Sequence, residues 1–218
     1  MAKPQAIELS ELERDALTEL ANIGVSRAAT NLSEMMGRQV FLSVPAVAIV
    51  TNDHAAQILQ MQEANSLVAV HQAFVGDFSG RVLLIFPETN SLALVRAVAG
   101  GDLPLEDIIE LEQEALAETG NIILNGCLSA IANMLRRSLS VSLPEIVRGS
   151  GPDLFELPEA DAEDVVLFLY INFSVNDHDI RGYIAMLMDL SSLESLRHLL
   201  RELIQRTIDE IPAVTHVA

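Results

Sequence analysis

The stretch "LTELANIGVSRAATNLSEMMG", residues 17–37, decides the fold, because a second stretch, "LAETGNIILNGCLSAIANML" at residues 116–135, repeats its pattern. In both, apolar residues return every three or four positions, which indicates a long helix with one buried face. Both also carry Glu, two further residues and Asn at the same place in the pattern. The sequence therefore predicts two equivalent helices that share a Glu-x-x-Asn pair.

The likeness of the two halves extends beyond these helices. Five pairs of identical residues are separated by one constant interval that runs into the following strand: Glu19 and Glu118, Asn22 and Asn121, Ile23 and Ile122, Met35 and Met134, Pro45 and Pro144. The interval then slips by a few residues, as a loop insertion would cause, so that Gly80 matches Gly182. This pattern predicts a single domain, 8–206, built of two repeats at about 8–101 and 105–206, with 207–218 as a C-terminal tail.

Each repeat reads as helix, strand, hairpin and helix. Ser10 and Glu13 carry the signature of a capping box before the first helix, which we expect to end near Gly37. The other predicted elements of the first repeat are a strand at 40–50, whose Pro45 marks an edge or a break, hairpin strands at 66–75 and 79–87, and a helix at 89–100. The second repeat has a helix at 105–137, a strand at 139–147, a surface loop, a hairpin turning at 176–179 and a closing helix.

These elements predict a mixed α/β (α+β) fold. Because three strands alone bury too little apolar surface, we expect the two repeats to contribute their strands to one shared sheet. The result would be a pseudo-two-fold body that carries two long, exposed motif helices.

Composition and charge exclude several classes of partner. Half of the residues are hydrophobic, which indicates a globular chain, and the net charge of -18 disfavours both nucleic acid and an anionic membrane surface. The single cysteine, Cys127, leaves no internal disulfide and predicts a cytoplasmic location. No apolar run reads as a membrane span. A protein or small-molecule partner is therefore expected.

The Glu-x-x-Asn pairs belong to polar stripes. Positions i, i+4, i+7 and i+11 of a helix share one face. The first stripe is Asp15, Glu19, Asn22 and Ser26, and the second is Glu114, Glu118, Asn121 and Asn125. Such stripes can be the plain solvated faces of amphipathic helices. Two features favour a binding surface instead: Asn, a poor helix former, recurs at the same position, and neither stripe contains the Lys or Arg that would pair with its carboxylates.

No metal or nucleotide site is predicted. The five histidines show no paired spacing, Cys127 has no cysteine partner, and no phosphate-binding loop occurs. We therefore expect the chain itself to bind no metal or cofactor.

At these residues the chain resembles the CheC-type family of chemotaxis phosphatases, which includes CheC, CheX and FliY. The shared motif is an acidic or Ser residue, Glu four residues further on, Asn three residues after the Glu, and a Pro some distance beyond. It stands here as "DALTELAN" with Pro45 and as "EALAETGN" with Pro144, and the flanking segments resemble the family too.

The resemblance implies a function. Members of the family hydrolyse the aspartyl phosphate of a CheY-like response regulator in chemotaxis or related two-component signalling. It assigns Glu19 and Glu118 to an ion pair with a regulator lysine, and Asn22 and Asn121 to orienting the attacking water. The regulator would supply Mg²⁺. Asp15, Ser26, Glu114 and Asn125 would complete the partner-binding surface.

Two alternatives stay open at this stage. The chain could instead be a non-catalytic adaptor. Such an adaptor would bind either a receiver domain or, as some family members do, a CheD-like deamidase. Arg27 lies about a quarter-turn from the first stripe, where it could contact an acidic partner or pair with a local carboxylate.

Overall fold

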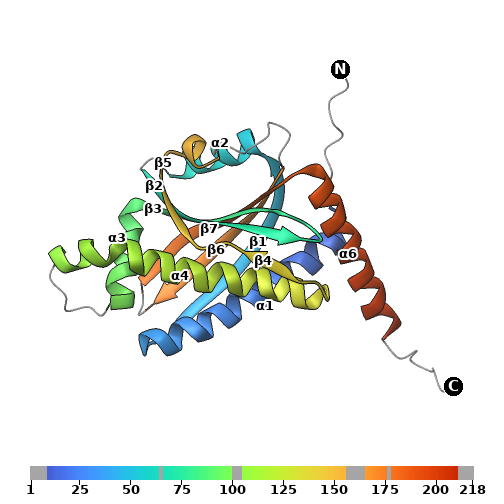
Figure 1. The fold of residues 1–218 in the computed structure, drawn as a ribbon, viewed down its shortest axis with the longest axis horizontal. Helices are drawn as coiled ribbons and strands as arrows, with labels where there is room; N and C mark the ends of the chain where they lie inside the picture. Colours follow the sequence, from blue (N-terminus) through green and yellow to red (C-terminus); the bar gives the residue numbers. More distant parts are fainter. Residues whose placement is uncertain (1–8, 64–65, 100–104, 156–164, 176–177, 211–218) are drawn as a thin grey trace.

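The computed structural model describes residues 9–63, 66–99, 105–155, 165–175 and 178–210. A seven-stranded antiparallel sheet forms its centre. Figure 1 shows two long helices lying side by side along one face of the sheet, α1 (Glu11–Met36) and α4 (Leu105–Met134), while α2 (Asn52–Gln62) and α5 (Gly151–Phe155) cover the other face. The remaining elements are β1 (Val40–Thr51), β2 (Leu67–Gly76), β3 (Gly80–Pro87), α3 (Glu88–Ala99), β4 (Leu139–Val141), β5 (Glu145–Gly149), β6 (Val165–Val175), β7 (His178–Met188) and α6 (Leu190–Asp209).

The strand order is β1-β6-β7-β3-β2-β4, and β5 also pairs with β2. β1 to β3 come from the first half of the chain and β4 to β7 from the second, so each half supplies one edge of the sheet and two inner strands. If β4 and β5 together correspond to β1, β6 to β2 and β7 to β3, then exchanging the two halves gives the same strand order read from the opposite edge. The mixed α/β fold with one shared sheet is confirmed, and the order supports the two-repeat organisation, which stays a prediction.

Most predicted elements are confirmed. Ser10 and Glu13 form the capping box, and α1 ends at Gly37, whose φ of 63° lies in the left-handed region that glycine adopts without strain. Both hairpins are present, although residues 100–101 and the turn at 176–177 lie outside the described residues. The proposed tail begins too early, because α6 continues to Asp209; residues 211–218 are outside the described part.

Three local features were not predicted. α2 lies in a segment to which the sequence assigned no element, α5 is a helix where the sequence indicated a loop, and the strand expected at 139–147 is divided into β4 and β5 around Pro144. A short helix such as α2 buries only Ala55, Ala56 and Leu59, too few apolar positions to show helical periodicity. At the other edge of the sheet, β1 continues past Pro45 with a bulge between Ser43 and Ala46.

The two long helices cross in backbone contact. A Cβ atom built on Gly24 of α1 would lie 2.6 Å from the Cα atom of Cys127 and 2.8 Å from the carbonyl oxygen of Gly126, both on α4. One built on Gly126 would lie 2.9 Å from the Cβ atom of Ala28. Small residues therefore set the separation of the helices, while the predicted buried face of α1 packs into the core with Leu17 and Leu20.

One described helix segment, Leu111–Met134, is long and apolar enough to cross a membrane by length and composition, contrary to the expectation from the sequence. Just over half of its apolar window, 56%, is buried inside the fold against the sheet and α1. The core helix of a soluble protein meets the same criterion, so this feature alone is weak evidence for a span.

The N-terminus of α1 is fastened to α6 by a buried carboxylate. Glu13 accepts hydrogen bonds from the Ser10 N–H at 2.7 Å and from Arg201 Nε at 2.6 Å, and Arg197 lies 3.5 Å away. Burial acts to raise the pKa of Glu13, but the Ser10 and Arg201 hydrogen bonds and the charges of the two arginines outweigh it. The net effect lowers the pKa below its ordinary value.

The helix crossing makes the first prediction. Gly24→Ala should lower the free energy of unfolding by about 1–3 kcal/mol, because its methyl group would meet backbone atoms that cannot move aside. Denaturant unfolding measures the change, with Asn31→Ala, an exposed site on the same helix, as the matched control. Equal or higher stability of the Gly24 variant would show that the helices do not cross in contact.

The Glu13 clamp makes the second prediction. A lowered folded-state pKa stabilises the fold above the unfolded carboxyl's pKa of about 4.5, and this contribution disappears as the pH falls through the folded value. Glu13→Gln should therefore cost about 1–3 kcal/mol at pH 7 and progressively less in acid. Unfolding curves at pH 7 and pH 3 measure this change, with Glu34→Gln as the control. If the loss in free energy of unfolding were the same at both pH values, the ionised Glu13 would not fasten α1 to α6.

Candidate functional site

The structure places the two polar stripes on the outer flanks of the α1 and α4 pair. The stripe carboxylates are exposed, and none of them forms an ion pair or side-chain hydrogen bond with another described residue; they are Asp15, Glu19, Glu114 and Glu118. Ser26 is exposed as well, whereas Asn22, Asn121 and Asn125 are half-buried. Each Glu-x-x-Asn pair therefore combines an exposed, unpaired carboxylate with a half-buried carboxamide that lies closer to the sheet.

In the first copy the carboxamide grips the edge strand. Asn22 Nδ2 donates to the Val44 carbonyl at 3.0 Å, and the Val44 N–H donates back to Asn22 Oδ1 at 2.9 Å. Asn22 Nδ2 also donates to the Thr18 carbonyl at 3.0 Å. In this structure the amide hydrogens and the oxygen of Asn22 therefore all have partners within the protein, and its role in orienting a water stays a prediction.

The bulge in β1 explains why Asn22 is occupied. Val44 and Pro45 fall outside the register that pairs β1 with β6, and proline has no N–H to donate. Val44 is only 2% exposed, so its N–H and carbonyl require partners within the protein. α1 supplies them through Asn22, and one turn from its C-terminus Ser33 Oγ accepts from the Val40 N–H at 2.9 Å. The helix thereby covers part of the outer edge of the sheet.

In the second copy the carboxamide is held by side chains instead. Asn121 Oδ1 accepts from Gln72 Nε2 at 3.1 Å and from Asn125 Nδ2 at 2.7 Å. Gln72 Nε2 also donates to the Ser142 carbonyl at 2.9 Å, which ties α4, β2 and the segment before Pro144 together. Asn121 Nδ2 forms no hydrogen bond with any part of the chain that the structure describes.

The different course of the two Pro-bearing segments causes this difference. Leu143, which occupies the position of Val44 in the second repeat, is 85% exposed, so the chain turns outward there and breaks into β4 and β5. Its backbone is not presented to Asn121. Sequence reasoning missed Gln72, although a Gln within the apolar strand sequence "LVAVHQAFV" was a signal that it had a partner.

Other groups near the stripes have no catalytic features. Arg27 is exposed and forms no ion pair with the described residues, so it remains available to a partner. Burial raises the pKa of the Cys127 thiol to about 12, which keeps it protonated and unreactive. Within the described ranges, no three His, Cys, Asp or Glu residues lie close enough to hold a metal ion.

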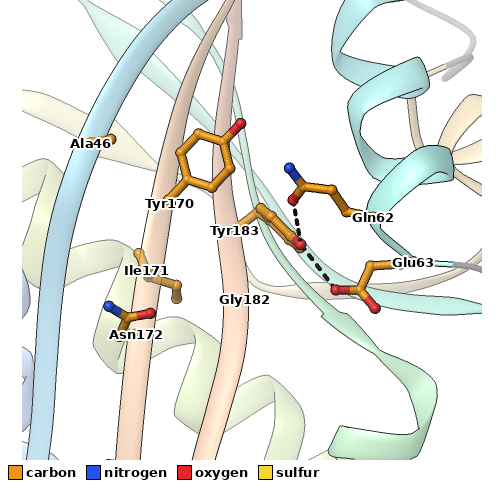
Figure 2. Close-up of a pocket in the computed structure, with 8 residues that line it drawn as sticks. All are labelled: Ala46, Gln62, Glu63, Tyr170, Ile171, Asn172, Gly182 and Tyr183. Atoms are coloured by element: carbon orange, nitrogen blue, oxygen red, sulfur yellow. Dashed lines mark hydrogen bonds between the residues drawn. The ribbon is translucent and has the colours of Figure 1, made fainter.

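A hollow of about 590 Å³ lies on the other face of the sheet, away from both stripes. Figure 2 shows Tyr183 pointing toward Gln62 and Glu63, and its hydroxyl lies 2.9 Å from an oxygen of each. Tyr170 forms the neighbouring wall, with its ring centroid 5.8 Å from that of Tyr183. The hollow contains no stripe residue, and the Glu-x-x-Asn pairs remain the candidate site.

Comparison with known proteins points to one family. Residues 12–49, which contain the first pair and Pro45, match the model of the CheC-like family. The chain is 25% identical to the CheY-P phosphatase CheC of Bacillus subtilis over 86% of its own length and 93% of that protein. It is 24% identical to the flagellar motor switch phosphatase FliY of the same organism over 66% of this chain, but it spans only 37% of FliY.

Fold comparison agrees with this. The crystal structure of FliY from Thermotoga maritima superposes with a TM-score of 0.72 and covers 90% of this chain and 99% of that one, at 17% identity. That likeness shows the shared fold. The family model and the two relatives show that the chain is similar to the CheC-like family.

Proposed function

We propose that this chain hydrolyses the aspartyl phosphate of a CheY-like response regulator. The observation that carries the proposal is the Glu-x-x-Asn pair, present twice with an exposed, unpaired Glu beside a half-buried Asn. The names of two relatives, a CheY-P phosphatase and a switch phosphatase, give the chemistry and the partner.

The division of labour follows from the side chains. Glu19 and Glu118 form no ion pair with any cation of the described residues, so each can pair with a lysine of the regulator. Asn22 and Asn121 would orient the attacking water, which lowers the barrier through positioning and requires no perturbed base. The regulator would hold Mg²⁺ beside its own phosphate. Asp15, Ser26, Glu114 and Asn125 would complete the contact surface.

The charge of this chain limits how the partners meet. At -18 it would repel an acidic regulator at long range, and salt screens such fields beyond about 8–10 Å. Docking would therefore depend on local contacts of the two stripes. The cytoplasmic location expected from Cys127 fits such a partner and stays a prediction.

The phosphatase makes the third prediction. Asn22→Ala combined with Asn121→Ala should reduce the decay rate of the phosphorylated receiver to that of the receiver alone in Mg²⁺, because no group is left to orient water. The matched control is Asn31→Ala with Asn133→Ala, which removes an exposed Asn from each helix. Since Asn22→Ala also removes the Val44 hydrogen bonds, circular dichroism must show that the variant is folded. A folded double variant that stimulates as well as the parent would exclude the mechanism.

The docking role makes the fourth prediction. Glu19→Gln with Glu118→Gln should raise KM by about 5-fold to 150-fold through the loss of an interfacial ion pair, with little change in stability because both carboxylates are unpaired. Saturation curves with increasing receiver measure it, and Glu34→Gln serves as the control. An unchanged KM would remove the glutamates from the docking surface.

A non-catalytic adaptor, binding a receiver domain or a CheD-like deamidase, is the alternative function. The engaged state of Asn22 favours it for the first copy, since that carboxamide cannot meet a water without leaving Val44. Following receiver phosphate with and without the chain separates the two functions: an adaptor binds the receiver and leaves the decay rate unchanged.

A further inference from the structure

We infer that the two Glu-x-x-Asn copies are unequal, and that Gln72 is a positioning residue that orients Asn121 for turnover. This inference rests on the proposed phosphatase function and names the copy and the supporting side chain that carry it. Gln72 lies on β2, far in sequence from both helices, and does not belong to either stripe.

Gln72 is buried at the seam between α4 and the sheet. Gln72 is only 1% exposed, and its Nε2 donates hydrogen bonds to Asn121 Oδ1 and to the Ser142 carbonyl. Ser142 is itself fixed to β2, because its Oγ accepts from the Ala73 N–H at 2.9 Å. The Gln72 amide that donates to Asn121 is thus held in place both by its own strand, β2, and by Ser142.

The hydrogen bonds determine which end of the Asn121 carboxamide faces outward. The terminal torsion of Asn is broad and nearly two-fold, so a free carboxamide exchanges its oxygen and nitrogen ends readily. Gln72 Nε2 and Asn125 Nδ2 together occupy the two lone pairs of Asn121 Oδ1. Nδ2 is left to donate to a partner's water or phosphoryl oxygen, always in the same direction.

The first copy has no such arrangement. Asn22 binds the Val44 N–H and carbonyl with both ends of its carboxamide, so it would have to release a buried edge strand before it could orient a water. In this conformation Asn22 holds the backbone of β1, whereas Asn121 hydrogen-bonds only to the side chains of Gln72 and Asn125 among the described residues. The second copy is therefore the one poised for turnover.

Gln72 is also a poor choice for packing alone. Its Oε1 is buried and has no hydrogen-bond partner within the described residues, which carries a desolvation penalty. An apolar side chain of the same shape would remove that penalty. A residue that retains it while directing a donor at Asn121 fits a positioning role better than a structural one.

A double-mutant cycle tests the inference, using the parent, Gln72→Met, Asn121→Ala and the two combined. Met keeps the shape of Gln and donates no hydrogen bond. We expect Gln72→Met to lower kcat about 10-fold to 100-fold, with KM changed less than about twofold because Glu118 still docks. In the Asn121→Ala background the same substitution should change the residual rate less than about twofold.

The outcomes are distinct. A fall in kcat of the same factor in both backgrounds, or no fall in either, overturns the inference while the phosphatase stands. A parent that does not accelerate receiver decay overturns the proposed function and the inference with it. If Gln72→Met fails to show a parent-like thermal transition, Asn125→Asp replaces it, because that change removes the other donor to Asn121 Oδ1 from the helix surface. The same kcat loss, absent in the Asn121→Ala background, is then expected, and an unchanged kcat overturns the inference.

Discussion

The backbone contact between α1 and α4 at Gly24 and Gly126 is the constraint on which the rest depends. With no side chain between them, neither helix can turn about its axis without a clash with the other. That contact leaves the Glu-x-x-Asn faces on the outer flanks of the pair. Asn22 then meets β1 at one edge of the sheet, and Asn121 meets Gln72 of β2 near the other edge.

The same motif is supported in two ways. In the first copy, the bulge at Pro45 buries Val44 and leaves its backbone to be satisfied by Asn22. In the second copy, the chain turns outward at Leu143, and a buried Gln supplies the partner instead. The two helices thus share the Glu-x-x-Asn residues but differ in the groups behind them, and in the first helix the Asn holds the edge strand.

Sequence reasoning reached the parts of the fold that rest on periodicity and local chemistry. The capping box at Ser10, the stop at Gly37 and the hairpins all follow from short-range rules, and the repeat indicated one shared sheet. α2 was missed because it buries few apolar residues. The division of the second strand was missed because Pro144 permits a bulge or a break equally, and tertiary packing decides between them.

The sequence indicates which residues form the candidate site, but it does not show which groups their side chains contact. A helical wheel places Asn22 and Asn121 on one face, yet it cannot show which backbone or side-chain groups approach from strands far away in sequence. The grip of Asn22 on Val44 and the approach of Gln72 to Asn121 both arise from such contacts. The free state of Glu19 and Glu118, by contrast, follows from the absence of Lys and Arg in the stripes, which sequence alone shows.

The central claim is that a receiver domain docks on these helices. Its most direct test is a crystal structure of this chain with a CheY-like receiver carrying beryllofluoride, a mimic of the aspartyl phosphate. The account predicts Asn121 beside the beryllofluoride and Glu118 within ion-pair distance of a receiver lysine. A receiver bound elsewhere, such as over the Tyr170 and Tyr183 hollow with both stripes exposed, would contradict it.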